Sequence, residues 1–205
     1  MKKTISIILL LLCTNVYAWD NESTHRDISE VAANLSLNAE QLSKAYELYG
    51  KNQPALKWIQ DGAELEDAGS FTTLSKARFR NHFHNPLANL TPPTGTLTDG
   101  GLTDKLTGQS TFFWAQDGVN QLNHEGGDWS WKTRDIYYRS LTTTSNVDIE
   151  MLTAMTYQGL GHQMHLVQDM AQPDHVRNDA HPVDGTGMFN FFEKWAKVQY
   201  PLIRT

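Results

Sequence analysis

The chain of 205 residues almost lacks cysteine, and its single one, Cys13, lies near the start. Lys2 and Lys3 precede an apolar run that ends at Cys13 and is too short to cross a bilayer. This pattern predicts a signal peptide of residues 1–18, cleaved after Ala18, and a secreted or periplasmic mature chain without a transmembrane segment. Because Cys13 leaves with the signal peptide, no disulfide stabilises the mature fold.

Positive charge is scarce as well, with 17 Lys and Arg against 23 Asp and Glu and a net charge of −6. No run of basic residues offers a broad surface for a nucleic acid backbone. A phosphate-bearing substrate would need local positive charge, for which bound cations are the obvious source. A glycine-rich phosphate loop and a GxSxG motif are also missing, which disfavours a covalent serine or cysteine mechanism.

Sustained alternation of apolar and polar residues, the pattern of half-buried strands, is missing too. We therefore expect one all-α domain of residues 19–205, interrupted by a long surface loop rich in Gly, Pro and Thr at residues 87–109. Aromatic residues at helical spacing, such as Tyr137 and Tyr138, are expected to pack in the core rather than to stack on bases. Helical patterns cover residues 24–35, 38–49, 54–67, 112–122, 129–141, 146–169 and 188–200.

The first two predicted helices carry signals for where they begin. Thr24 is expected to cap the first helix. The inward face of that helix is expected to carry His25, Ile28, Ala32 and Leu35. Asn38 and Gln41 have the spacing of a capping box, which opens a second helix that is expected to reach Tyr49 and to end at Gly50.

A dense group of side chains that could carry chemistry lies between Gly161 and His175. His165 and Asp169 are four residues apart, so they project from the same face of a helix. Pro173 interrupts that helix, and the turn is expected to bring His175 back near its end. Such pairs also occur as ordinary helix contacts, but converging imidazole and carboxylate groups are a suitable start for a zinc site.

Further candidate ligands are spread along the chain. His25 is either a ligand or a buried histidine with a hydrogen bond at a helix start. An acidic cluster of the kind that is commonly just solvated ends the third predicted helix; it consists of Asp61, Glu64, Glu66 and Asp67. It is followed by the HFHNP motif, which starts at His82 and turns at Asn85-Pro86.

Together these residues resemble the zinc-dependent phospholipase C family and the related single-strand-specific zinc nucleases. The resemblance covers essentially the whole mature chain, and its most specific parts are Trp19, the HFHNP motif and the H-x3-D-x5-H motif of residues 165–175. It implies a helical fold with a metal cleft between the helices and two or three zinc ions. The HFHNP motif is closer to the phospholipases, whereas the short gap from Trp19 to His25 is closer to the nucleases.

The resemblance also implies a role for each candidate ligand. Trp19 would bind a first zinc through its α-amino nitrogen and backbone carbonyl, together with His25. Asp169 would bridge that zinc to a second one. The remaining ligands of the second zinc would be Asp67, His82 and His165.

A third zinc would be bound by His175 and Glu193, together with a histidine one helical turn before the glutamate. In this chain that position is Phe189. Either the third zinc lacks this ligand, or His181 replaces it.

The resemblance implies a secreted phospholipase C, which would hydrolyse phospholipid at a membrane surface to diacylglycerol and a phosphorylated head group. Asp67 would be both a zinc ligand and the catalytic proton acceptor. The alternatives are a zinc nuclease that acts on single-stranded nucleic acid, and a zinc-stabilised binding protein with little activity. The departure at Phe189 favours the last of these.

Overall fold

The computed structural model describes residues 21–67, 77–84, 86, 94–95, 108–124, 126–130, 132–176, 192, 195–196 and 198–199. The predicted signal peptide and the predicted ligands Trp19, His181 and Glu193 lie outside the described residues, as does Phe189. Most of the predicted loop at 87–109 and of the predicted helix at 188–200 also lies outside them.

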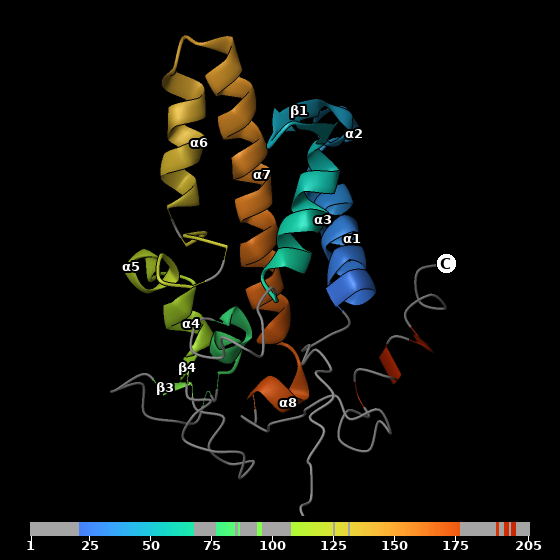
Figure 1. Cartoon of the computed structure of the whole chain (residues 1–205). Helices are drawn as coiled ribbons and strands as arrows, with labels where there is room; N and C mark the ends of the chain where they lie inside the picture. Colours follow the sequence, from blue (N-terminus) through green and yellow to red (C-terminus); the bar gives the residue numbers. More distant parts are fainter. Residues whose placement is uncertain are drawn as a thin grey trace, which may run out of the picture.

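The described part of the chain is mostly helical, as predicted. Four of its helices stand side by side in the order α6, α7, α3, α1 (Figure 1). They are α1 (Arg26–Ser36), α3 (Ala55–Leu65), α6 (Thr133–Thr142) and α7 (Asn146–Asp169). The long helix α7 packs against both α3 and α6, so its residues form the centre of the row.

Shorter elements connect and flank this row. They are η1 (Asn21–His25), α2 (Ala39–Ser43), η3 (Arg78–Asn81), β3 (Thr94–Gly95), β4 (Gly108–Gln109), α4 (Thr111–Trp114), α5 (Gly118–Gln121) and α8 (Pro173–Val176). The strands β3 and β4 form a short antiparallel pair. No helix among the described residues is long and apolar enough to cross a membrane.

The prediction of a helix up to Tyr49 is wrong. The capping box is present, since Asn38 accepts a hydrogen bond from the backbone N–H of Gln41 at 2.7 Å, but α2 ends at Ser43. The chain then forms an antiparallel hairpin of β1 (Ala45–Leu48) and β2 (Lys51–Pro54). Tyr49 and Gly50 make its turn with φ of 54° and 72°, the left-handed pair that a two-residue hairpin turn requires.

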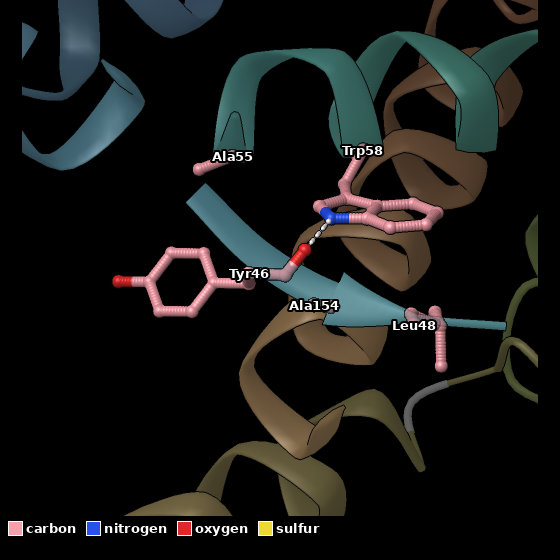
Figure 2. Packing of buried hydrophobic residues seen from close by; sticks show 5 residues of the cluster. All are labelled: Tyr46, Leu48, Ala55, Trp58 and Ala154. Carbon is pink, nitrogen blue, oxygen red and sulfur yellow. Dashed lines mark hydrogen bonds between the residues drawn. The ribbon is translucent and has the colours of Figure 1, made fainter. Parts of the chain in front are cut away.

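The hairpin closes one end of the core. Side chains along β1 alternate between exposed and buried, so Tyr46 and Leu48 face inward. They pack with Ala55 and Trp58 of α3 and with Ala154 of α7 (Figure 2). The indole N–H of Trp58 donates a hydrogen bond to the backbone oxygen of Tyr46 at 3.0 Å, which ties the hairpin to α3.

The start of α1 also differs from the prediction. Thr24 is not its cap, because a turn of π-helix at Asn21–His25 precedes the helix and His25 occupies the cap position. Ser29 and Ala33 are buried on the inward face, one turn apart, whereas Leu35 is 84% exposed. The inward face is therefore rotated away from Leu35, while His25 remains buried.

The prediction that aromatic residues fill the core holds for Trp114 and Trp129, which are buried, but it fails on α6. Tyr137 and Tyr138 are 52% and 67% exposed, and Leu141 is 66% exposed. Helix α6 lies at the edge of the row (Figure 1), where packing against α7 covers one face and leaves these side chains outside.

Two glycines set the distance between α3 and α7. A Cβ atom on Gly62 would lie 1.9 Å from the backbone oxygen of Gln158, and one on Gly161 would lie 2.0 Å from that of Ile59. Only glycine fits at such contacts between helix backbones. This close approach places the C-terminal end of α3 beside the last turns of α7, where His165 and Asp169 lie.

Candidate metal centre

Six of the predicted ligands lie in the described part of the chain, and the structure brings them together. They are His25 before α1, Asp67 after α3, His82 after η3, His165 and Asp169 on α7, and His175 on α8. Every one of these residues is at most 2% exposed. Pro173 begins α8 after the turn that follows α7, so His175 returns to the end of α7 as predicted.

Two imidazole nitrogens each face two carboxylate oxygens at the centre of this cluster. Nδ1 of His82 lies 3.1 Å from Oδ1 of Asp67 and 3.0 Å from Oδ2 of Asp169. Nε2 of His165 lies 3.6 Å and 3.1 Å from the same two oxygens. The two imidazole nitrogens are 3.3 Å apart. Zinc bonds of about 2.0–2.2 Å in a tetrahedron give edges of roughly 3.3–3.6 Å, close to these distances.

The second oxygen of Asp169 faces a different part of the cluster. Its Oδ1 lies 3.6 Å from Nε2 of His25 and 3.6 Å from Nδ1 of His175. The rings of His25 and His165 stack with centroids 3.6 Å apart. Ligand atoms of two overlapping groups, His25 with Asp67 and His165, and His82 with His165 and Asp169, each lie within 4.8 Å of one another. These buried groups could hold a metal ion.

Three of the imidazoles are oriented by hydrogen bonds from their Nδ1 atoms. Nδ1 of His165 donates to the backbone oxygen of Ala63 at 2.5 Å, and Nδ1 of His175 donates to that of His82 at 2.7 Å. Nδ1 of His25 lies 2.7 Å from the amide oxygen of Gln168. Such bonds fix the proton on Nδ1 and leave Nε2 as the ligand atom.

The carboxylates supply a test of whether a cation fits. Both oxygens of Asp67 and both of Asp169 are buried and make no well-aligned hydrogen bond among the described residues, although imidazole nitrogens approach Oδ1 of Asp67 and Oδ2 of Asp169 to 3.0–3.1 Å; Nε2 of His25 makes none either. Burying an ionised carboxylate without a partner is costly, and buried charges are therefore paired or coordinate metals. Nitrogen and oxygen donors without thiolates suit a divalent cation such as zinc.

The titration behaviour of these groups reflects their mutual proximity. Burial disfavours an ionised carboxylate, but the imidazoles of His165, His175 and His82 outweigh it and hold the pKa of Asp169 well below its usual range. Burial likewise opposes a charged imidazole, yet Asp169 and neighbouring carboxylates raise the pKa of His82 well above its ordinary value. The pKa of His165 is raised for the same reason. Protons and metal cations therefore compete for these nitrogens.

The acidic cluster after α3 divides into residues with different surroundings. Asp61 contacts Arg26, Lys57 and Gln53 near the surface, away from the histidines. Asp67 faces His82 and His165, the two histidines that the resemblance groups with it. Glu66, for which the sequence predicted no role of its own, is completely buried.

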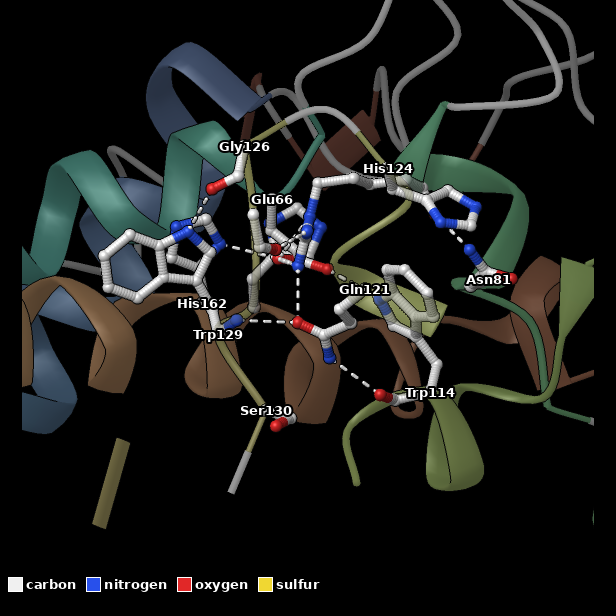
Figure 3. Close-up of polar contacts among 12 residues, drawn as sticks. Glu66, Asn81, Trp114, Gln121, His124, Gly126, Trp129, Ser130 and His162 are labelled. Atoms are coloured by element: carbon white, nitrogen blue, oxygen red, sulfur yellow. Dashed lines mark hydrogen bonds and ion pairs between the residues drawn. The ribbon is translucent and has the colours of Figure 1, made fainter. Parts of the chain in front are cut away.

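Glu66 belongs to a buried polar network beside the metal centre (Figure 3). Its Oε2 accepts hydrogen bonds from Nε and Nη2 of Arg78 at 2.9 and 2.7 Å and lies 2.6 Å from Nδ1 of His162. Its Oε1 accepts one from Nε1 of Trp114 at 2.9 Å. The charge of Arg78 outweighs the effect of burial and holds the pKa of Glu66 well below its usual range.

The network extends to a buried glutamine and a tryptophan. Gln121 accepts hydrogen bonds from Nη2 of Arg78 at 3.0 Å and from the backbone N–H of Trp129 at 2.8 Å (Figure 3). The ring of Trp129 stacks on His162 with centroids 4.9 Å apart. Burial lowers the pKa of His162 to about 4, so this imidazole is neutral at pH 7.

Compared with protein-family models, with curated proteins and with solved structures, the chain matches none of them. The evidence for its function therefore comes from its own residues and their geometry.

Proposed function

We propose that the cluster binds zinc and that the protein is a secreted zinc-dependent phosphodiesterase, most consistent with a phospholipase C. The observation that carries the proposal is that the imidazole nitrogens of His82 and His165 each face an oxygen of Asp67 and an oxygen of Asp169, at 3.0–3.6 Å. Asp169 would bridge this site to a second one at His25, because its two oxygens face the two groups of histidines. His175, with Glu193 and His181, would serve a third.

The proposed reaction follows from the charge of the centre. Bound zinc ions would supply the positive charge that attracts a phosphate diester to an acidic protein and stabilises charge on its oxygens. Asp67 is the proposed proton acceptor for the attacking water. Its Oδ1 faces His82 and His165, which leaves Oδ2 to take the proton. The hydrogen bonds of His165 and His25 to Ala63 and Gln168 hold these imidazoles in place during the reaction.

A second candidate, a nuclease for single-stranded nucleic acid, gains one observation from the structure. Tyr137 and Tyr138 on α6 are exposed, so they are available to stack on bases. The pocket of about 390 Å³ beside Tyr137 is lined by α6 and α7. The net charge of −6 weighs against this candidate, because little positive surface is left to bind a nucleic acid backbone.

Both candidates are tested by one set of assays on the zinc-loaded mature chain. Phosphatidylcholine vesicles and single-stranded DNA are offered in parallel, with and without a chelator. We expect chelator-sensitive release of diacylglycerol from the vesicles and little cleavage of DNA. Cleavage of DNA alone would favour the nuclease, and absence of both activities from a zinc-loaded protein would favour the zinc-stabilised binding protein.

A further inference from the structure

Glu66 lies on the far side of His82 from the proposed metal ligands. Nδ1 of His82 points to Asp67 and Asp169, at 3.1 and 3.0 Å, and its Nε2 lies 3.6 Å from Oε1 of Glu66. Among the described residues, Nε2 of His82 has no hydrogen-bond partner, although the atom is buried. An imidazole that gives its Nδ1 lone pair to a cation carries its proton on Nε2. That proton would point toward the carboxylate of Glu66.

We propose that Glu66 is a positioning residue, which receives the Nε2–H of His82 and so holds Nδ1 of His82 toward the metal centre. The inference rests on the proposed metal site and assigns a role to a residue outside its ligand set. A carboxylate behind a metal-bound histidine fixes the orientation of the ring and makes the nitrogen ligand more basic. The separation of 3.6 Å would shorten to a hydrogen bond when the metal orients the ring.

The surroundings of Glu66 exclude a role as a ligand in its present rotamer. Arg78 and His162 bind Oε2, and Trp114 binds Oε1, so the carboxylate is fixed from three different elements. Arg78 is fixed in turn, because it donates to the backbone oxygen of Gly127 at 2.7 Å and lies over the ring of Trp114, 5.1 Å from its centroid. A carboxylate held so rigidly can define the orientation of the imidazole that faces it.

The alternative is that Glu66 serves only as the buried partner of Arg78. Two substitutions separate these roles. Glu66→Met removes the charge and the oxygen that faces His82, whereas Glu66→Gln keeps an oxygen and loses the charge. Gln121→Met is the matched control, because Gln121 is also buried and accepts a hydrogen bond from Arg78. Unlike Glu66, Gln121 makes none of the described contacts to His82.

Each variant is titrated with zinc against a chromophoric chelator, and its free energy of unfolding is measured in urea. We expect E66M to bind zinc about 10–100-fold more weakly than the wild type, and E66Q to lie between them. The visible absorption of the cobalt-loaded protein should change in E66M and stay unchanged in Q121M. Q121M should lose stability but keep its zinc affinity within about threefold of the wild type. This change is well below the loss of affinity expected when a residue that holds a metal ligand in place is removed.

Zinc affinity and a cobalt spectrum equal to the wild type in E66M would overturn the proposal and leave Glu66 as a partner of Arg78 alone. If E66M does not fold, E66Q replaces it, because glutamine preserves the shape of the side chain. Zinc affinity and a cobalt spectrum equal to the wild type in E66Q would then overturn the proposal. A wild-type protein that binds neither zinc nor cobalt would instead refute the proposed function. The two failures are therefore distinguishable.

Discussion

Asp169 is the residue that connects the two groups of histidines. One of its oxygens faces His82 and His165, and the other faces His25 and His175. The H-x3-D-x5-H spacing predicted that His165, Asp169 and His175 meet, because helix geometry and Pro173 determine it locally. Asp67 and His82 could be added only by resemblance, since their approach depends on the packing of α3 against α7.

The sequence could not distinguish Glu66 from its acidic neighbours. Asp61, Glu64, Glu66 and Asp67 are alike in type and lie close together. Their roles depend on partners from distant parts of the chain, such as Arg78 and His162, which only the fold brings near. Local spacing contains no information about such contacts.

Replacing Asp169 by asparagine tests the bridging position. Asn keeps the size of the side chain but removes the charge, so we expect zinc affinity to fall by more than about 100-fold. That loss is larger than the one expected for a residue that only holds a metal ligand in place. Competition with a chelator measures this, and circular dichroism checks the fold. Asp135→Asn, an exposed change on α6, is the control and should bind zinc like the wild type. Equal affinities for both variants would contradict the bridging position.

Metal binding should depend on pH in a defined direction. The pKa values of His82 and His165 are raised, because the attraction of neighbouring carboxylates outweighs burial, so these imidazoles keep protons above their ordinary pKa of about 6.5. Zinc must displace those protons, and its affinity should fall as the pH falls. Calorimetry at about pH 8 and pH 6, in buffers of different ionisation enthalpy, measures the protons released. An affinity that is constant over this range would be inconsistent with zinc binding at these nitrogens.

At the scale of elements, the centre is held by the contact of α3 with α7. Individual residues predicted the capping box at Asn38 and the turn at Pro173, and the periodic patterns predicted these helices. They failed at β1 and β2, because two short strands joined by Tyr49-Gly50 are difficult to distinguish from the end of a helix. They also failed on the exposed side of α6, since periodicity does not reveal how much of a helix its neighbours cover.

Gly62→Ala should separate the two helices. The new Cβ would meet the backbone oxygen of Gln158, which cannot move aside like a side chain. We expect a loss of about 1–3 kcal/mol in the free energy of unfolding, as for overpacked cores, together with weaker zinc binding. Urea denaturation and zinc titration measure the two effects.

Gly159→Ala on α7 is the matched control, because its Cβ would meet the side chain of Thr133 on α6, 2.4 Å from its Oγ1, and not the backbone of α3. It should also lose stability, but its zinc affinity should stay closer to that of the wild type, because the contact between α3 and α7 is unchanged. Equal stability and equal zinc affinity in wild type and G62A would show that the close helix contact does not support the centre.

At the scale of the whole molecule, an acidic chain encloses a cluster of buried carboxylates and imidazoles. Charge and composition predicted the need for cations, and the lack of alternating apolar and polar residues predicted the mostly helical class. The buried network around Glu66 and the exposed face of α6 became apparent only in the folded structure. Protein groups satisfy the Nδ1 atoms of His25, His165 and His175, but not the carboxylates of Asp67 and Asp169. We infer that metal binding contributes to the stability of the folded chain.

Zinc should therefore raise the thermal stability of the protein. A ligand that binds only the folded state adds about 2.7 kcal/mol at a concentration of one hundred times its Kd. For a chain of this size, that corresponds to an increase in Tm of roughly 5–10 °C. Differential scanning calorimetry with zinc and with a chelator measures the shift, and magnesium, which prefers oxygen ligands, is the control. Equal shifts with zinc and magnesium would contradict a site with imidazole ligands.

The central claim is that the buried cluster around Asp169 is a zinc centre. Elemental analysis of the mature protein, dialysed against metal-free buffer after zinc loading, tests it most directly. We expect two or three zinc ions per chain, and fewer in Asp169→Asn analysed in parallel. A wild-type chain that retains no zinc, or a variant that retains as much as the wild type, would contradict the claim.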